Sequence, residues 1–96
     1  MAGSNNFTGL RKEIAEVTLK IFDLCGERLQ LVKQIAKVKA QQKIAVEDPR
    51  VEHALEAKVL DVCRSYDMDR EFCLKLLALI LKESKRVQRQ VTRSEV

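Results

Sequence analysis

Residues 8–42 read TGLRKEIAEVTLKIFDLCGERLQLVKQIAKVKAQQ and contain no proline. Side chains of this segment repeat at alternating spacings of four and three residues, and all but one of the repeating side chains are apolar. The pattern is typical of a helix that packs along its whole length against another helix. We therefore predict one helix over residues 8–42, with Thr8 as its N-cap. This heptad series consists of Leu10, Ile14, Val17, Ile21, Leu24, Arg28, Leu31, Ile35 and Val38.

The length of this predicted helix has a consequence for assembly. With a rise of about 1.5 Å per residue, the helix would be about 52 Å long. A compact chain of 96 residues has a diameter of only about 32 Å. Because the helix is longer than the globule that would have to cover it, the heptad series needs a second chain. The sequence predicts a homodimer.

The second helix has a strong start signal. Asp48 stands where an N-cap belongs, and Pro49 follows at the first helical position, a combination that favours helix initiation. We predict a helix over residues 49–65, after a short connection at residues 43–47. Its apolar face consists of Val51, Leu55, Val59 and Val62.

A third helix follows a turn at residues 66–68, in which Asp67 tolerates a left-handed backbone conformation. Asp69 caps this helix, which we predict over residues 69–92. No segment shows the period-two alternation of a β-strand, so the predicted fold class is all-α, with three helices per chain. The apolar stripe of the third helix consists of Phe72, Leu76, Leu79, Ile80, Val87 and Val91.

Length and composition exclude several classes of protein. The 96 residues allow one domain, which we place at residues 8–96 after a flexible N-terminus at residues 1–7. Hydrophobic residues make up 46% and charged residues 33% of the chain, which argues against disorder and against a membrane protein. No apolar run approaches the roughly 20 residues of a spanning helix, and the first residues lack the pattern of a signal peptide.

The three cysteines, Cys25, Cys63 and Cys73, show no CxxC spacing. We interpret them as buried thiols of a protein in the reducing cytoplasm. His53 is the single histidine, so no metal site is expected. The formal net charge of +4 suits an anionic partner without choosing among nucleic acid, phosphate and carboxylate.

Arg28 is the polar member of the heptad series. A buried guanidinium must meet an anion, a carboxylate side chain or water. One interpretation is an interhelical salt bridge that sets the register of the helices. Lys39 follows eleven residues later on nearly the same helical face, so the alternative is a cationic site that both residues line.

Two further polar pairs stand one helical turn apart: Ser84 with Gln88, and Asp48 with Glu52. Each pair alone is better explained by a solvated or capping role. Taken together with Arg28, they suggest a polar chamber inside a helical bundle, richer in cations than in anions. A small dicarboxylate would fit that balance of charge.

Arg11 adds a geometric constraint. It lies 28 residues before Lys39, or about 42 Å along a straight helix. No metabolite-sized ligand spans that distance, and only an antiparallel partner helix would bring Arg11 to the Lys39 end of another chain. If Arg11 is functional, the site is shared between subunits.

The order and spacing of five motifs resemble the all-helical (AroQ-class) chorismate mutases over about residues 10–90. The resemblance implies an intertwined homodimer with two equivalent sites, each taking one arginine from the neighbouring chain. It also implies rearrangement of chorismate to prephenate in phenylalanine and tyrosine biosynthesis, with no cofactor, no metal, no nucleic acid and no membrane involved. The motifs are Leu10-Arg11-Lys12-Glu13-Ile14, Glu27-Arg28-Leu29, Ile35-Ala36-Lys37-Val38-Lys39, Val46-Glu47-Asp48-Pro49 and Glu83-Ser84-Lys85-Arg86-Val87-Gln88.

The same resemblance implies roles for residues that bind the substrate carboxylates. Arg28 and Arg11 of the partner subunit hold the two carboxylates, and Ser84 assists with one of them. These three residues are expected to bind substrate, with Arg28 also counted among the catalytic groups.

The resemblance further implies that Lys39 and Gln88 donate hydrogen bonds to the ether oxygen of the substrate, as the main catalytic groups. Glu52, with the backbone near Asp48, is expected to receive the ring hydroxyl. Because the amide of Gln88 does not titrate near neutral pH, activity is not expected to require acid pH.

One position departs from the family pattern, which usually carries an arginine three residues after the aspartate. Val51 stands there, and Arg50 precedes it. A step of one residue turns a helical side chain by about 100°, so Arg50 is not an automatic substitute. Val51 is interpreted as a core valine. The missing cation leaves an isochorismate-pyruvate lyase of the same fold as an alternative activity.

Two alternatives are not enzymes. A basic dimeric module could bind nucleic acid through a cluster of cations near the end of the third helix, although such a cluster also suits the solvated last turns of any helix. A structural coiled-coil adaptor would explain the heptad series but would leave Arg28, Lys39, Ser84 and Gln88 without a shared purpose. The cationic cluster consists of Lys82, Lys85, Arg86, Arg89 and Arg93.

Overall fold

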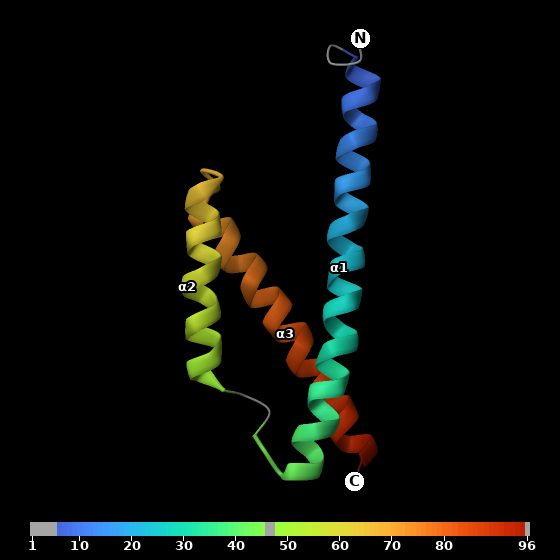
Figure 1. Cartoon of the computed structure of the whole chain (residues 1–96), viewed down its shortest axis with the longest axis vertical. Helices are drawn as coiled ribbons and strands as arrows, with labels where there is room; N and C mark the ends of the chain where they lie inside the picture. The colour runs from blue at the N-terminus through green and yellow to red at the C-terminus, as the bar shows by residue number, and fades with distance from the viewer. Residues whose placement is uncertain (1–5, 46–47, 96) are drawn as a thin grey trace. The chain divides into compact units, whose positions relative to one another are not determined.

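The structure is a computed structural model that describes residues 6–45 and 48–95. Three helices account for most of them: α1 (Phe7–Gln42), α2 (Pro49–Ser65) and α3 (Arg70–Glu95). The described ranges contain no strand (Figure 1), which confirms the all-α fold class. Two parts of the predictions lie outside the described residues: residues 1–5 of the predicted flexible N-terminus and residues 46–47 of the predicted connection.

The start of α1 differs from the prediction. The helix begins at Phe7, and the Oδ1 atom of Asn6 accepts a hydrogen bond from the backbone N–H of Gly9 at 3.2 Å. Asn6 is therefore the capping residue, and the prediction of Thr8 as N-cap is wrong. Asparagine is as good a cap as serine and better than threonine, and Thr8 already lies inside the first helical turn.

The end of α1 is closed by a left-handed residue. Lys43 has a φ of 58°, and the N–H of Ile44 donates to the carbonyl oxygen of Lys39 at 2.8 Å. A weaker bond of 3.4 Å runs from the N–H of Lys43 to the carbonyl of Ala40. This Schellman arrangement uses carbonyl groups that a helix end leaves unpaired. It fixes the helical turn that carries Lys39.

The predicted boundaries of α2 are confirmed. Asp48 is extended (φ −132°), and its Oδ1 atom accepts a hydrogen bond from the N–H of Arg50 at 3.1 Å. At the other end, Asp67 has the expected left-handed φ of 52°. The N–H of Met68 reaches back to the carbonyl of Cys63 at 2.8 Å, so α2 ends in the same type of motif as α1.

The start of α3 is also as predicted. The Oδ2 atom of Asp69 accepts a hydrogen bond from the N–H of Phe72 at 2.9 Å, and the helix begins at Arg70. The helix extends three residues beyond the predicted end, to Glu95. No proline or glycine follows residue 92 to stop it.

The chain divides into two compact units, one up to Gln30 and one from Leu31 onward, and each is described by itself. In the first unit the large apolar side chains of the heptad series are exposed, with fractions from 46% for Leu10 to 67% for Ile14. None of the described residues of this unit, 6–30, covers them. The helix of the first unit is therefore apolar on a face that its own residues leave open to solvent.

The second unit contains the end of α1 together with α2 and α3, and α2 packs directly on α3 (Figure 1). On α1 the buried residues of this unit are Val32 and Ala36, whereas Leu31 and Ile35 of the heptad series are 58% and 50% exposed. The face of α1 that is buried within the second unit is therefore different from the face that carries the heptad series. The buried apolar residues are Val32, Ala36, Cys63, Cys73, Leu77 and Val87.

The first half of the predicted apolar stripe of α3 is not buried in the single chain. Phe72, Leu76 and Leu79 are 52%, 39% and 64% exposed. The buried face contains instead Cys73 and Leu77, one residue further along the helix. A step of one residue turns the face by about 100°, so α3 carries two apolar faces, and only the second one is buried in this unit.

Val51, interpreted from the sequence as a core valine, is 63% exposed in the single chain, so its burial stays a prediction for the dimer. The prediction for the cysteines holds in part: Cys63 and Cys73 are buried, whereas Cys25 is partly exposed. Burial raises the pKa of the Cys73 thiol, and a hydrogen bond with Cys63 raises it further. Across the described residues, no helix combines the length and the apolar character of a membrane span.

The cap of α3 generates a test of the fold. Asp69→Ala removes the acceptor of the Phe72 N–H and should lower the free energy of unfolding by about 1 kcal/mol. Urea unfolding followed by circular dichroism measures the change. Asp69→Asn, which keeps a capping oxygen, is the matched control and should stay within about 0.3 kcal/mol of the wild type. Equal losses for both variants would contradict a capping role.

Candidate functional site

Two polar side chains are buried on α3. Ser84 is 5% exposed, and its hydroxyl donates to the carbonyl of Ile80 at 2.9 Å. Gln88, one turn later, is 9% exposed, and its Oε1 atom has no hydrogen-bond partner among the described residues. An unpaired buried polar atom costs about 1–3 kcal/mol, and native proteins keep few of them. In the interior of the second unit, the amide oxygen of Gln88 therefore remains able to accept a hydrogen bond.

The first turn of α2 supplies two carboxylates, those of Asp48 and Glu52. The Oδ1 atom of Asp48 accepts the capping hydrogen bond, and the backbone carbonyl of Asp48 accepts a hydrogen bond from the N–H of Glu52 at 3.1 Å. Both side chains are partly buried. The cap thereby fixes the orientation of the turn from which the Glu52 carboxylate projects.

Glu52 forms an ion pair that connects α2 to α3. The Nζ atom of Lys85 lies 3.4 Å from its Oε1 atom and 3.3 Å from its Oε2 atom. The side chains are 25% exposed for Lys85 and 31% for Glu52. Low exposure weakens solvent screening, so this pair attracts more strongly than a pair on the open surface.

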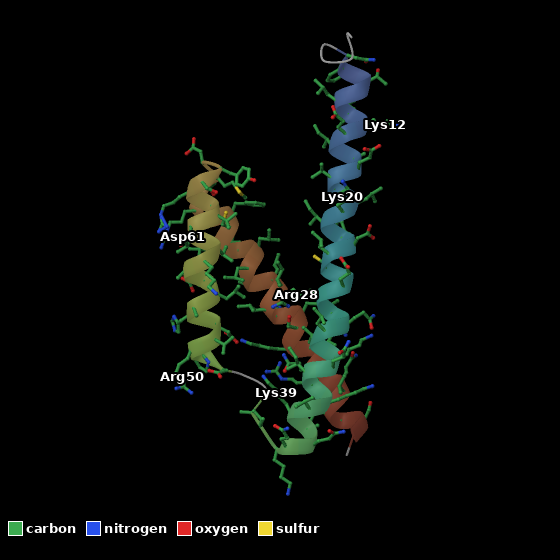
Figure 2. The ribbon with its side chains drawn as sticks, in the orientation of Figure 1. Lys12, Lys20, Arg28, Lys39, Arg50 and Asp61 are labelled. Atoms are coloured by element: carbon green, nitrogen blue, oxygen red, sulfur yellow. The ribbon has the colours of Figure 1, made fainter. Side chains whose placement is uncertain are left out.

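Lys39, labelled in Figure 2, lies three residues before the end of α1 and belongs to the second unit. It is partly buried. The hydrogen bond from the N–H of Ile44 to the carbonyl oxygen of Lys39 holds the backbone of Lys39 in place. Five predicted site residues thus occupy one compact unit: Lys39, Asp48, Glu52, Ser84 and Gln88.

The two predicted arginines belong to the first unit, where Arg28 is partly exposed (Figure 2). Arg11 is exposed, and its guanidinium lies over the ring of Phe7 at 4.2 Å from the ring centroid. This contact joins residues one turn apart on the same helix and is a cation–π interaction of modest strength. The expected role of Arg11 in a neighbouring site stays a prediction.

Lys85 is the residue that sequence reasoning missed in this site. It belongs to the cationic cluster of α3, and no local sequence pattern connects it with Glu52, 33 residues away. Arg86 of the same cluster is also paired, with both Glu83 oxygens at 2.7 Å, and this guanidinium lowers the pKa of the Glu83 carboxyl. Two cations of the cluster therefore have carboxylate partners within the chain, which weakens the nucleic-acid alternative.

The described residues contain no group of three or more His, Cys, Asp or Glu side chains arranged to hold a metal ion. The site therefore offers ammonium, hydroxyl, amide and carboxylate groups around a helical interior. Such groups bind and orient an anionic ligand and stabilise charge that develops on it.

Comparison with known proteins identifies the family. The family model for chorismate mutase type II matches residues 10–89. The chain belongs to this family. The match spans all three helices and includes every predicted site residue, from Arg11 to Gln88.

Two curated relatives agree with membership in the chorismate mutase type II family. A chorismate mutase of Methanocaldococcus jannaschii is 30% identical over 81 residues, which cover 84% of this chain and 82% of the relative. A bifunctional chorismate mutase/prephenate dehydratase of Buchnera aphidicola is 30% identical over 91 residues, 95% of this chain but only 24% of the relative. The chain therefore spans about a quarter of that longer protein. No solved structure matches the chain significantly.

Proposed function

We propose that this chain catalyses the rearrangement of chorismate to prephenate in the biosynthesis of phenylalanine and tyrosine, as a homodimer in the cytoplasm. The family match over residues 10–89 carries the proposal. Both relatives support it, since each is named as a chorismate mutase, alone or together with a second activity. The dehydratase activity of the longer relative is not part of the proposal.

The chemistry suits the groups that the site offers. The rearrangement is intramolecular and needs no nucleophile and no proton transfer. An enzyme accelerates it by confining the flexible dianion in its compact reactive conformation and by placing cations where charge develops. As the C–O bond breaks, the ether oxygen becomes more negative, so a fixed donor there favours the transition state over the ground state.

In the proposed mechanism Lys39 and Gln88 donate hydrogen bonds to the ether oxygen. The unpaired Oε1 atom of Gln88 supports this role. Rotation about the last side-chain torsion exchanges the oxygen with the NH₂ group, so the unpaired end of the amide can present a donor. The buried position of Gln88 keeps that donor away from competing water.

The remaining groups bind the substrate without taking part in bond making. Arg28 and Arg11 of the partner subunit hold the carboxylates, with Ser84 beside one of them. Glu52 accepts a hydrogen bond from the ring hydroxyl, together with the backbone near Asp48. The partly buried position of Glu52 supports this assignment, because a carboxylate shielded from water makes the stronger hydrogen bond.

The exposed heptad series supports the homodimer. Leu10, Ile14 and Val17 are 46%, 67% and 56% exposed in the single chain, and covering such side chains contributes about 25 cal/mol per Å² of apolar surface. A second copy of the same helix, running antiparallel, would cover them and bring its Arg11 toward the Lys39 end of its neighbour.

Incubation of the purified chain with chorismate, and separately with isochorismate, tests the activity. We expect prephenate from chorismate and no salicylate or pyruvate from isochorismate. Chromatography of the products measures both reactions. Formation of salicylate and pyruvate would instead favour the isochorismate-pyruvate lyase, and no turnover of either substrate would refute the proposal.

Replacement of Lys39 tests the electrostatic mechanism. Lys39→Ala should lower kcat by a factor of several hundred, because removal of one preorganised donor costs about 3–4 kcal/mol of transition-state stabilisation. The elution volume in size-exclusion chromatography should stay unchanged. Lys37→Ala, at an exposed position of the same helix, is the control and should retain wild-type kcat. Near-normal turnover of Lys39→Ala would remove Lys39 from the mechanism.

Subunit mixing tests the shared site. In the proposed site Lys39 comes from one subunit and Arg11 from the other. A homodimer of Arg11→Ala and a homodimer of Lys39→Ala each lack one of the two residues in both sites, so both should be nearly inactive. Co-expression of the two variants pairs them at random, and each mixed dimer contains one site with both residues intact. Activity should recover to about a quarter of the wild-type value. Absence of recovery would show that Arg11 acts within its own chain or not at all.

A further inference from the structure

The ion pair between Glu52 and Lys85 differs from the other ion pairs that the structure describes. The pairs Arg64–Asp61, Lys75–Glu71 and Arg86–Glu83 join residues three or four apart on one helix, with every side chain at least 43% exposed. The pair of Glu52 with Lys85 joins α2 to α3, and both side chains are less than one-third exposed. It is therefore the kind of pair that acts on tertiary geometry.

We propose that Lys85 is a positioning residue for the substrate: its ammonium group holds and neutralises the Glu52 carboxylate so that this carboxylate receives the ring hydroxyl of a dianionic ligand. The inference rests on the proposed function and deepens it, because neither the family resemblance nor the comparisons assign a role to Lys85. The geometry of the pair and the charge of the site carry it.

The geometry leaves Glu52 able to bind a hydroxyl. The Lys85 ammonium sits between the two carboxylate oxygens at 3.4 and 3.3 Å, longer than the 2.7 Å contacts of the Arg86–Glu83 pair. An ionised carboxylate has about four acceptor positions, so one shared ammonium leaves positions open. The pair orients the carboxylate without saturating it.

The charge balance of the proposed site explains why a cation beside Glu52 is useful. Glu52 alone would repel a ligand with two carboxylates, and the partly buried location would strengthen that repulsion. The neighbouring positions on α2 do not compensate: Val51 is apolar, and Arg50 (Figure 2) is exposed and forms no ion pair with the described residues. The compensating cation reaches Glu52 from α3.

The position of Lys85 also connects it with the buried polar pair. It follows Ser84 directly and stands three residues before Gln88, so it shares a side of α3 with the unpaired amide. The bridge to Glu52 thus sets the start of α2 against the turn of α3 that carries Ser84 and Gln88. A ligand between these elements would meet the hydroxyl acceptor and the amide donor in a fixed relation.

Steady-state kinetics with chorismate tests the inference. Lys85→Met keeps an unbranched side chain that is one atom shorter and removes its charge. It should raise KM about tenfold, by the arithmetic of a single charge repulsion in a partly shielded site, and should lower kcat less than about threefold. Lys85→Arg should restore KM to within about threefold of the wild type, because it keeps the cation. Lys82→Met, at an exposed position of α3, is the matched control and should leave KM unchanged.

A double-mutant cycle shows whether Lys85 acts through Glu52. The amide of Glu52→Gln still accepts a hydrogen bond and carries no charge to neutralise. Adding Lys85→Met to Glu52→Gln should therefore change KM by less than about threefold, against tenfold in the wild-type background. This comparison separates a positioning role from a structural role. A merely structural lysine would change thermal stability, but Lys85→Met would then have the same effect on KM in the wild-type and in the Glu52→Gln background. If Lys85→Met alone does not fold, Lys85→Gln enters the cycle in its place.

Each outcome decides the inference. A KM effect below twofold for Lys85→Met, an equal effect for Lys82→Met, or equal effects in the two Glu52 backgrounds would overturn the role of Lys85 and leave the proposed function standing. Absence of chorismate turnover by the wild-type chain would overturn the proposed function, and the inference with it.

Discussion

An apolar face that the single chain leaves open to solvent is the constraint on which the rest of this protein depends. The heptad series of α1 keeps large side chains such as Ile14 and Leu24 more than 60% exposed. Burial of such a face is the main favourable term in helix association. A helix of 36 residues with this face calls for a second helix along its length, and the proposed homodimer answers that need. The proposed sharing of Arg11 between subunits follows from the same constraint.

The second unit shows how a small helical interior can hold polar chemistry. α3 presents two apolar faces, and the face that carries Leu77 and Val87 is buried together with Ser84 and Gln88. A buried amide oxygen without a partner reduces stability. An apolar side chain at Gln88 would avoid that loss, so stability alone does not account for the residue. Substrate binding does, in the function proposed for this chorismate mutase family member.

At the start of α2, charge is arranged by a contact between helices rather than along one helix. The cap at Asp48 sets the first turn of α2, and the bridge from Lys85 then connects Glu52 with α3. An acidic group beside a dianion is tolerable only where a cation offsets it. Val51 does not provide that cation. In the proposed site, the ion pair of Lys85 with Glu52 therefore explains how two carboxylates are compatible with an anionic ligand.

Local signals in the amino-acid sequence were sufficient for the helices: the Asp48-Pro49 start, the left-handed Asp67 and the Asp69 cap act over one turn, and each is found as predicted. Thr8 failed as a cap, and the pattern of α3 left open which apolar face is buried within the chain, because a short pattern does not distinguish two competing caps or faces. The heptad series and the helical spacing pointed to Arg28, Lys39 and Gln88, and the resemblance to the family supplied their expected roles. Only the tertiary structure decided that Lys85 meets Glu52 and that Cys73 and Leu77 form the buried face of α3, because both depend on contacts between residues far apart in the chain, for which no local spacing codes.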